Sequence, residues 1–89
     1  MKETIWIFNG ENSNFPSAVF SRIELAEEWI AKYKLNGVLT SYPIDQSVYD
    51  WAIINGYFIP KNEKEISPQF IGKFSSASQE HIHYENGKK

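Results

Sequence analysis

Residues 21–37 decide the fold of this chain, and they read SRIELAEEWIAKYKLNG. The apolar side chains of this stretch recur at helical spacing and form one stripe, which consists of Leu25, Ala26, Trp29, Ile30 and Tyr33. Ser21 and Glu24 match a capping box, and Gly37 is a stop signal for a helix. The stretch therefore predicts an amphipathic helix near 22–34, with its apolar stripe packed against a sheet.

Segments of strand-like composition flank this helix on both sides. Residues 4–8 are β-branched or aromatic and are apolar on both faces, which is typical of a strand in the middle of a sheet. A polar turn cluster at 9–14 and a short strand near 18–20 follow, so these two strands are predicted to form a hairpin. Beyond the helix, residues 38–42 and 79–84 predict a third and a last strand.

Two further helices are predicted between the third and the last strand. Residues 47–55 place their apolar side chains on one helical face, and Gly56 ends that pattern. Ser67 and Pro68 suit the cap and the first position of a short helix that carries phenylalanines. The order β-β-α-β-α-α-β indicates an α+β fold with two main helices and one short helix. We expect a small mixed or antiparallel sheet of three to four strands, with the helices on one face.

Composition limits the classes of function. The 89 residues include no cysteine, 16% aromatic residues and a formal net charge of −2. The absence of cysteine excludes a disulfide scaffold, a zinc ribbon and a thiol nucleophile. No apolar run approaches the roughly 20 residues of a membrane span, and the basic residues do not cluster as nucleic-acid binding requires. We therefore expect a single domain at 1–89 with a frayed tail at 84–89, located in the cytoplasm, with neither a membrane nor nucleic acid as its partner.

The aromatic residues are expected to hold the small core, because each buried ring removes roughly 150–250 Å² of surface from water. The predicted core consists of Trp6, Ile7, Leu25, Trp29, Ile30, Leu39, Trp51, Ala52, Ile54, Phe58, Phe70 and Phe74. Rings left at the surface would mark a contact site. Tyr42, Tyr49 and Tyr57 are the candidates, and each is either a core residue or part of a binding surface.

The tract around His81 and His83 has metal-ligand chemistry at short spacing. On a strand, these two imidazoles point to the same side, where they can both be ligands of one Zn²⁺, Ni²⁺ or Fe²⁺ ion. The chain has no other histidine, so a carboxylate such as Glu11, Asp45 or Asp50 would have to complete the site. We therefore predict no metal site and no cofactor, with His81 and His83 as the weak candidates, and keep His83 as a binding residue beside the three tyrosines.

Five segments are distinctive in combination, namely 6–10, 15–20, 42–53, 55–58 and 76–84. Through them the chain resembles, over about residues 4–86, a family of small stand-alone bacterial proteins that form a domain of unknown function. The resemblance implies that the polypeptide is a complete unit. It implies no activity, cofactor or catalytic residue.

No motif for nucleophilic catalysis or nucleotide binding occurs, so we do not expect an enzyme. The leading hypothesis is a non-catalytic module that binds another protein, with an immunity protein or an inhibitor as one version. The alternative is a regulatory domain that binds a small ligand in a pocket lined by Tyr42, Tyr49, Tyr57 and His83. A metal-dependent enzyme at His81 and His83 is a third hypothesis. A monomer and a homodimer both fit, because a last strand at a sheet edge can pair with its twin.

Overall fold

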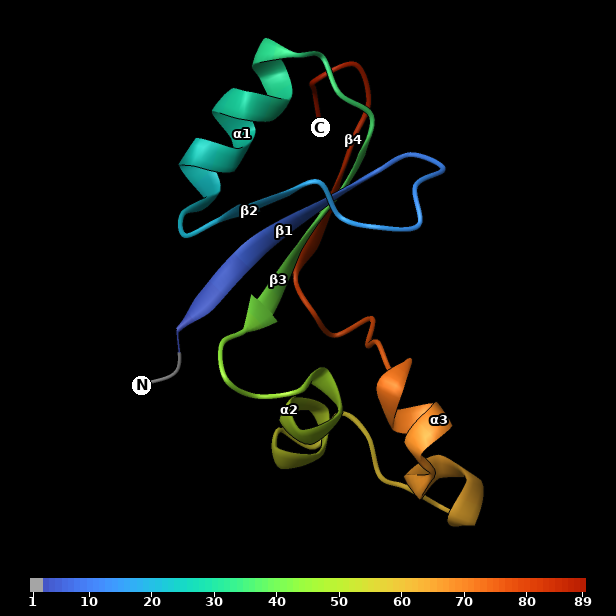
Figure 1. Cartoon of the computed structure of the whole chain (residues 1–89). Coiled ribbons are helices and arrows are strands. Elements are labelled where there is room, and N and C mark those ends of the chain that lie inside the picture. Colours follow the sequence, from blue (N-terminus) through green and yellow to red (C-terminus); the bar gives the residue numbers. More distant parts are fainter. Residues whose placement is uncertain (1–2) are drawn as a thin grey trace.

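The computed structural model describes residues 3–89 and contains a four-stranded antiparallel sheet with helices on both sides (Figure 1). The strands are β1 (Thr4–Gly10), β2 (Ala18–Phe20), β3 (Gly37–Pro43) and β4 (His81–Tyr84). The helices are α1 (Ile23–Lys32), α2 (Val48–Ile54) and α3 (Pro68–Gly72), and a 3₁₀ turn at Glu63–Ile66 precedes α3. The predicted α+β class and the predicted order of strands and helices are confirmed.

The sheet has the order β2-β1-β3-β4. Trp6 of β1 lies opposite Phe20 of β2 on one side and opposite Ser41 of β3 on the other. The apolar character of both faces of β1 therefore reflects its place inside the sheet, and the predicted hairpin of β1 and β2 is confirmed.

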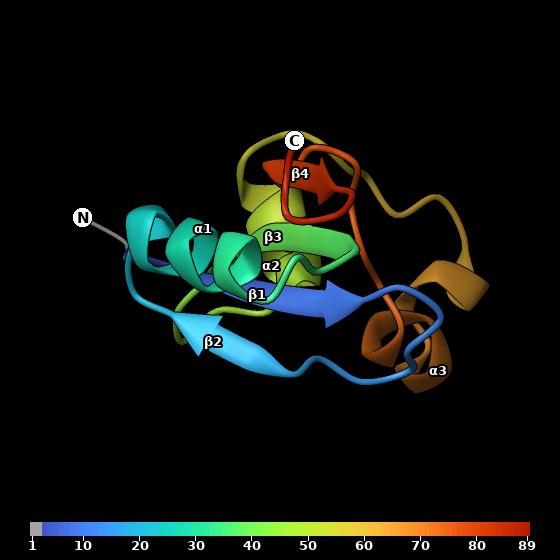
Figure 2. The same cartoon turned by 90° about the horizontal axis from the view of Figure 1, so that it is seen from above.

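The first core lies between the sheet and α1. Phe8 pairs with Leu39, and Leu39 pairs with Ile82, so these side chains share one face. Helix α1 lies across this face (Figure 2). It buries Ala26 and Ile30 against the sheet. Because four strands and one helix enclose it, this core contains the largest fully buried side chains.

The ends of α1 differ from the prediction. Arg22 is the N-cap residue and makes no side-chain capping bond, so the predicted capping box at Ser21 is wrong. The helix stops at Lys32, and Lys34 takes the left-handed conformation (φ 55°) expected at a helix end. Gly37 instead begins β3, where an added Cβ would lie 2.6 Å from Phe8 Cζ.

The helices do not share one face of the sheet, which corrects the expectation. α1 lies on one side, whereas α2 and α3 lie on the other (Figures 1 and 2). A second aromatic cluster lies there, and its rings contact one another with centroids 4.8–6.4 Å apart; its members are Tyr49, Phe58, Phe70 and Phe74. The predicted cap at Ser67 is confirmed, because its side chain accepts a hydrogen bond from the backbone at the start of α3. Ser47 does the same at the start of α2.

The predicted core is correct at its centre and wrong at its edges. Ile30, Leu39 and Ala52 are buried as expected, and the predicted tryptophans and phenylalanines are half-buried. Leu25 and Ile54 are exposed, because each lies at the margin of its apolar stripe and nothing packs over it. The prediction missed Phe8 and Tyr84, which are buried. Ala26 of the predicted apolar stripe is buried as well, and of the two alternatives for Tyr49 the structure supports the core.

Residues 84–89 are held in place by contacts where fraying was expected. Tyr84 is part of the first core, and the backbones of Glu85 and Lys88 pair in an antiparallel β-bridge. Between them, Asn86 (φ 55°) and Gly87 (φ 82°) make a tight turn. The Gly87 N–H donates to the Leu35 carbonyl at 2.9 Å, so the turn is fastened to the connection between α1 and β3.

Within residues 3–89, no helix has both the length and the apolar character needed to cross a bilayer.

Candidate functional site

The three candidate tyrosines lie in different surroundings. Tyr49 is buried, and its hydroxyl donates to the Glu65 carbonyl at 2.8 Å, which makes it part of the second cluster. Tyr42 is half-buried on the face of β3 that points away from α1. Tyr57 is 56% exposed and lies against Trp51, with ring centroids 5.3 Å apart.

The structure therefore does not bring the three tyrosines and His83 together in the one pocket that was predicted. His83 lines a cavity that includes none of the three tyrosines, and Tyr57 lines a different one. The candidate sites are better defined by two regions, an exposed apolar segment that begins at the last residue of α2 and an open polar cavity at one end of the sheet.

The exposed apolar segment consists of residues 54–59. Ile54, Tyr57 and Ile59 are 72%, 56% and 70% exposed. The local structure explains this, because α2 ends at Ile54 and Gly56 then turns the chain in the left-handed conformation (φ 78°). Beyond the turn, Phe58 points into the second cluster, and its neighbours on either side are left facing solvent.

A shallow cavity of about 250 Å³ lies beside this segment. It is lined by Gly56, Tyr57, Phe58, Ile59, Lys61 and Glu65. The Lys61 N–H donates to Glu65 Oε1 at 2.8 Å, so the charged side of the cavity is ordered by a local contact. Ligand pockets for small molecules usually have about 300–1,000 Å³. This cavity is smaller than that range.

The second region is an open polar cavity of about 890 Å³. It lies where the loop after β1, the start of β3 and the turn at 85–88 meet. Its polar lining consists of Asn9, Glu11, Asn12, Ser13, Asn36, His83, Glu85, Lys88 and Lys89.

Two of the amides of the polar cavity hold its walls together. Asn9 Nδ2 donates to the Ser13 carbonyl at 2.9 Å, and Asn36 Oδ1 accepts from the Asn86 N–H. The side chains that remain to contact a ligand include those of Glu11, Asn12, His83, Glu85 and Lys88.

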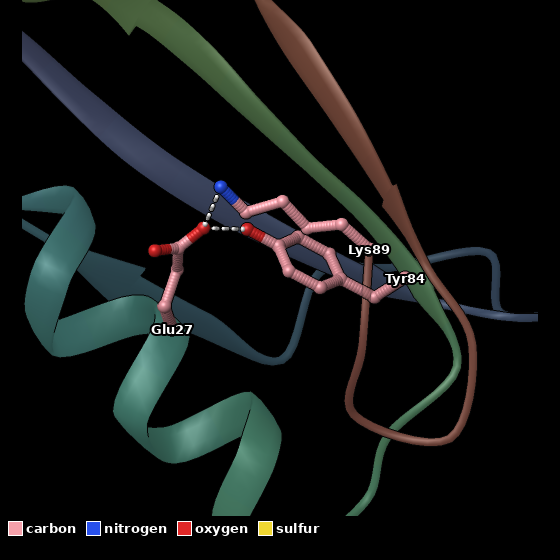
Figure 3. Close-up of polar contacts among 3 residues, drawn as sticks. All are labelled: Glu27, Tyr84 and Lys89. Atoms are coloured by element: carbon pink, nitrogen blue, oxygen red, sulfur yellow. Dashed lines mark hydrogen bonds and ion pairs between the residues drawn. The ribbon is translucent and has the colours of Figure 1, made fainter.

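A small polar cluster joins α1 to the chain end beside this cavity (Figure 3). Glu27 Oε2 accepts from the Tyr84 hydroxyl at 2.6 Å and lies 3.0 Å from Lys89 Nζ. The hydrogen bond from Tyr84, followed by that from Lys89, lowers the pKa of the Glu27 carboxyl below its ordinary value. Burial, reinforced by the Glu27 carboxylate, raises the pKa of the Tyr84 hydroxyl. The cluster thus keeps Glu27 charged and Tyr84 neutral, and it acts as a link between α1 and β4.

His81 and His83 lie on the exposed face of β4, with ring centroids 5.6 Å apart. His81 Nδ1 lies 2.8 Å from the Gln79 carbonyl oxygen, so that nitrogen carries the proton and donates. Gln79 is itself buried and held by Ser41 and Ser76. Among residues 3–89, no group of three His, Cys, Asp or Glu side chains is placed to hold a metal ion.

The wall of the polar cavity formed by residues 85–88 was missed in the sequence. The dipeptide Asn86-Gly87 is a strong signal for a two-residue hairpin turn, because both positions accept positive φ. Because residues 84–89 were expected to fray, Glu85 and Lys88 were not considered as residues that contact a ligand.

Comparison with known proteins supports the resemblance seen in the sequence. The model of a family described as a domain of unknown function, DUF7710, matches residues 5–89. No curated protein and no solved structure matches the chain. Because the match covers nearly the entire sequence, the chain belongs to the DUF7710 family.

Proposed function

We propose that this protein is a non-catalytic interaction module that binds another protein through the exposed apolar segment 54–59. The single observation that carries the proposal is the exposure of three large apolar side chains, Ile54, Tyr57 and Ile59, within six residues. Neighbouring exposed apolar residues are typical of contact surfaces, whereas scattered ones are ordinary. An immunity protein or an inhibitor is one form that such a module takes.

The surroundings of the segment support this use. Phe58 anchors it to the second cluster, where it stacks on Phe70 with centroids 5.7 Å apart. The binding surface is therefore held on one side by packed rings, which lowers the entropy lost when a partner docks. Lys61 and Glu65 give the adjacent cavity a polar rim, which is the usual arrangement around an apolar contact. The matching partner has an apolar side chain that enters this cavity.

The proposal includes a bacterial cytoplasm as the compartment. Disulfides are rare in the cytosol, so a chain without cysteine is compatible with that location.

Site-directed photo-crosslinking in the native host tests the proposal. A crosslinker at Ile59 should join the protein to one partner, and a crosslinker at Phe15, which is 78% exposed on the loop after β1, should not. The partner is then purified and its affinity measured by calorimetry. The double variant Ile54→Ser, Ile59→Ser should bind at least ~10-fold more weakly, and Phe15→Ser should bind like the wild type. Equal crosslinking at Ile59 and Phe15, or equal affinity of all variants, would contradict the proposal.

A second candidate function is supported by the polar cavity of about 890 Å³, which has the size of a small-molecule site. In this hypothesis the protein is a regulatory domain for a small polar ligand. A metabolite that raises the melting temperature of the wild type should fail to do so for Glu11→Gln and Lys88→Gln. Stabilisation that persists in both variants would exclude the polar cavity.

A further inference from the structure

The outer side of β4 has free backbone hydrogen-bonding groups. β4 is at the edge of the sheet, and within residues 3–89 no strand pairs with the outer side of residues 81–84 (Figure 2), because the antiparallel bridge with Lys88 begins at Glu85. The Ser41 N–H donates to the Glu80 carbonyl at 2.8 Å, which identifies residues 80, 82 and 84 as those that bond to β3. By the antiparallel alternation, the backbone N–H and C=O groups of His81 and His83 therefore point away from the sheet.

One antiparallel register satisfies all of these groups with a second copy of β4. If Ile82 lies opposite Ile82 of the second copy, each His81 lies opposite a His83. The four outward N–H groups then meet the four outward carbonyls. A shift by two residues in either direction leaves half of them unpaired within the four-residue strand. The edge is thus self-complementary about a twofold axis at Ile82, as a symmetric dimer requires.

The same register brings four imidazoles together. His81 and His83 project from the face of the sheet opposite α1, and directly opposed residues have Cβ atoms about 4.5–5.5 Å apart. We propose that two copies of this chain pair through β4 and bind one zinc ion between the His81 and His83 side chains of both copies. The site is incomplete in one chain, since no third ligand is placed near the pair within residues 3–89.

The two rings in one chain already have a spacing that suits zinc. Zn–N bonds of about 2.0–2.1 Å in a tetrahedral site place two imidazole centroids about 5 Å apart, and here they are 5.6 Å apart. His81 donates its Nδ1 proton to the Gln79 carbonyl, which leaves Nε2 with the lone pair that a metal needs. A backbone carbonyl in this position is the usual second contact of a zinc-ligating histidine.

The other face of the paired strands also favours the dimer. Ile82 is half-buried at the edge of the first core, on the α1 side. In the dimer it would contact Ile82 of the second copy, which extends the core across the interface and removes apolar surface from water.

Sedimentation velocity of the full chain tests the proposal directly. With EDTA the protein should be a monomer, and zinc should lower the apparent dissociation constant of the dimer by at least ~100-fold, with one zinc bound per two chains. The double variant His81→Asn, His83→Asn should lose this response. The matched control is Val19→Asn, which is 60% exposed on the opposite edge strand and on the same face, and it should behave like the wild type.

A cysteine crosslink tests the register separately. The chain has no cysteine, so Ile82→Cys introduces the only thiol. Opposed residues of this pair type have Cα atoms about 4.5 Å apart, within the range that a disulfide spans. With zinc present and dissolved oxygen as the oxidant, Ile82→Cys should therefore form a disulfide-linked dimer, and Val19→Cys should not.

Three results would overturn the proposal. They are a zinc-loaded monomer with one ion per chain, a dimer that persists with EDTA and in the double histidine variant, and equal crosslinking at positions 82 and 19.

Discussion

The two sides of the sheet use aromatic residues in different ways. On the α1 side, Phe8 is one member of a mixed core with Ile30 and Leu39, and these three side chains are the largest that are fully buried. On the α2–α3 side, the rings mainly contact one another, and Ile54 and Ile59 remain exposed beside them.

The difference follows from the lengths of the elements. Helix α1 has 10 residues and lies over paired strands, whereas α2 has 7 residues and α3 has 5. Helices this short are not stable alone, so ring contacts and caps hold them. The α1 side is therefore the more closely packed of the two, and the α2–α3 side leaves large apolar side chains at the surface, where we propose that a partner binds. Four substitutions, each compared with a second variant, test this comparison.

The largest expected effect is that of Phe8→Ala. Removing a fully buried phenylalanine should lower the free energy of unfolding by about 3–5 kcal/mol, because the sheet and α1 cannot close over the cavity. Phe70→Ala removes a half-buried ring from the second cluster and should cost clearly less. Urea unfolding measures both values. An equal or larger loss at Phe70 would show that the second cluster carries the stability.

Gly37→Ala should cause the next largest loss in the free energy of unfolding. The added Cβ would lie 2.6 Å from Phe8 Cζ and close to the Asn9 carbonyl, so β1 must shift, at a cost of about 1–3 kcal/mol. The control is Gly72→Ala in α3, where nothing lies within 4 Å, and it should be neutral or stabilising. Thermal unfolding of the two variants measures how tightly each side of the sheet is packed. Similar losses of stability in both would show that the two sides do not differ in packing.

Tyr49→Phe should have a smaller effect. It removes the hydroxyl that donates to the Glu65 carbonyl and leaves the ring, so a loss of about 1 kcal/mol is expected from one hydrogen bond. The control Tyr57→Phe lies on the exposed segment and should change stability by less than ~0.5 kcal/mol. The urea midpoints of the two variants measure this difference in stability. Equal midpoints would mean that the hydrogen bond of Tyr49 does not stabilise the second cluster.

The smallest expected effect concerns pH and Glu27. Its pKa is lowered in the folded protein, so its charged form stabilises the fold above the ordinary carboxyl pKa. That contribution is lost as the pH falls through the lowered value. Because Glu27 is partly exposed, the contribution is below ~1 kcal/mol.

Glu27→Gln should therefore flatten the stability profile between about pH 6 and pH 3, with the exposed Glu28→Gln as the control. Melting temperatures across this range provide the measurement. Parallel profiles for the wild type and Glu27→Gln would rule out a role for this carboxylate.

Much of the fold was predictable because local signals agreed with the tertiary arrangement. The predicted cap at Ser67 needs only nearby backbone groups, and it is confirmed. Phe8 and Tyr84 were missed because their burial depends on a register across three strands, which no local pattern contains. Gly37 matched a helix stop, but its real constraint is the approach of β1, a contact with a residue far away in the sequence.

The candidate site was predictable only in part. Exposed rings were expected between 42 and 58, and Tyr57 is one, whereas Ile54 and Ile59 were not among the candidates. Aliphatic residues next to a short helix satisfy the pattern of a core equally well, so exposure could not be inferred from spacing.

The position of Tyr84 has a consequence for how the protein is made. The first core draws on β1, α1 and β3, which are complete by residue 43, and on β4, which ends at residue 84. During synthesis the ribosome therefore releases a hairpin and a helix whose shared interior stays open to water until the last strand emerges. The nascent chain must keep this apolar surface from aggregating until the residues of β4 have been added.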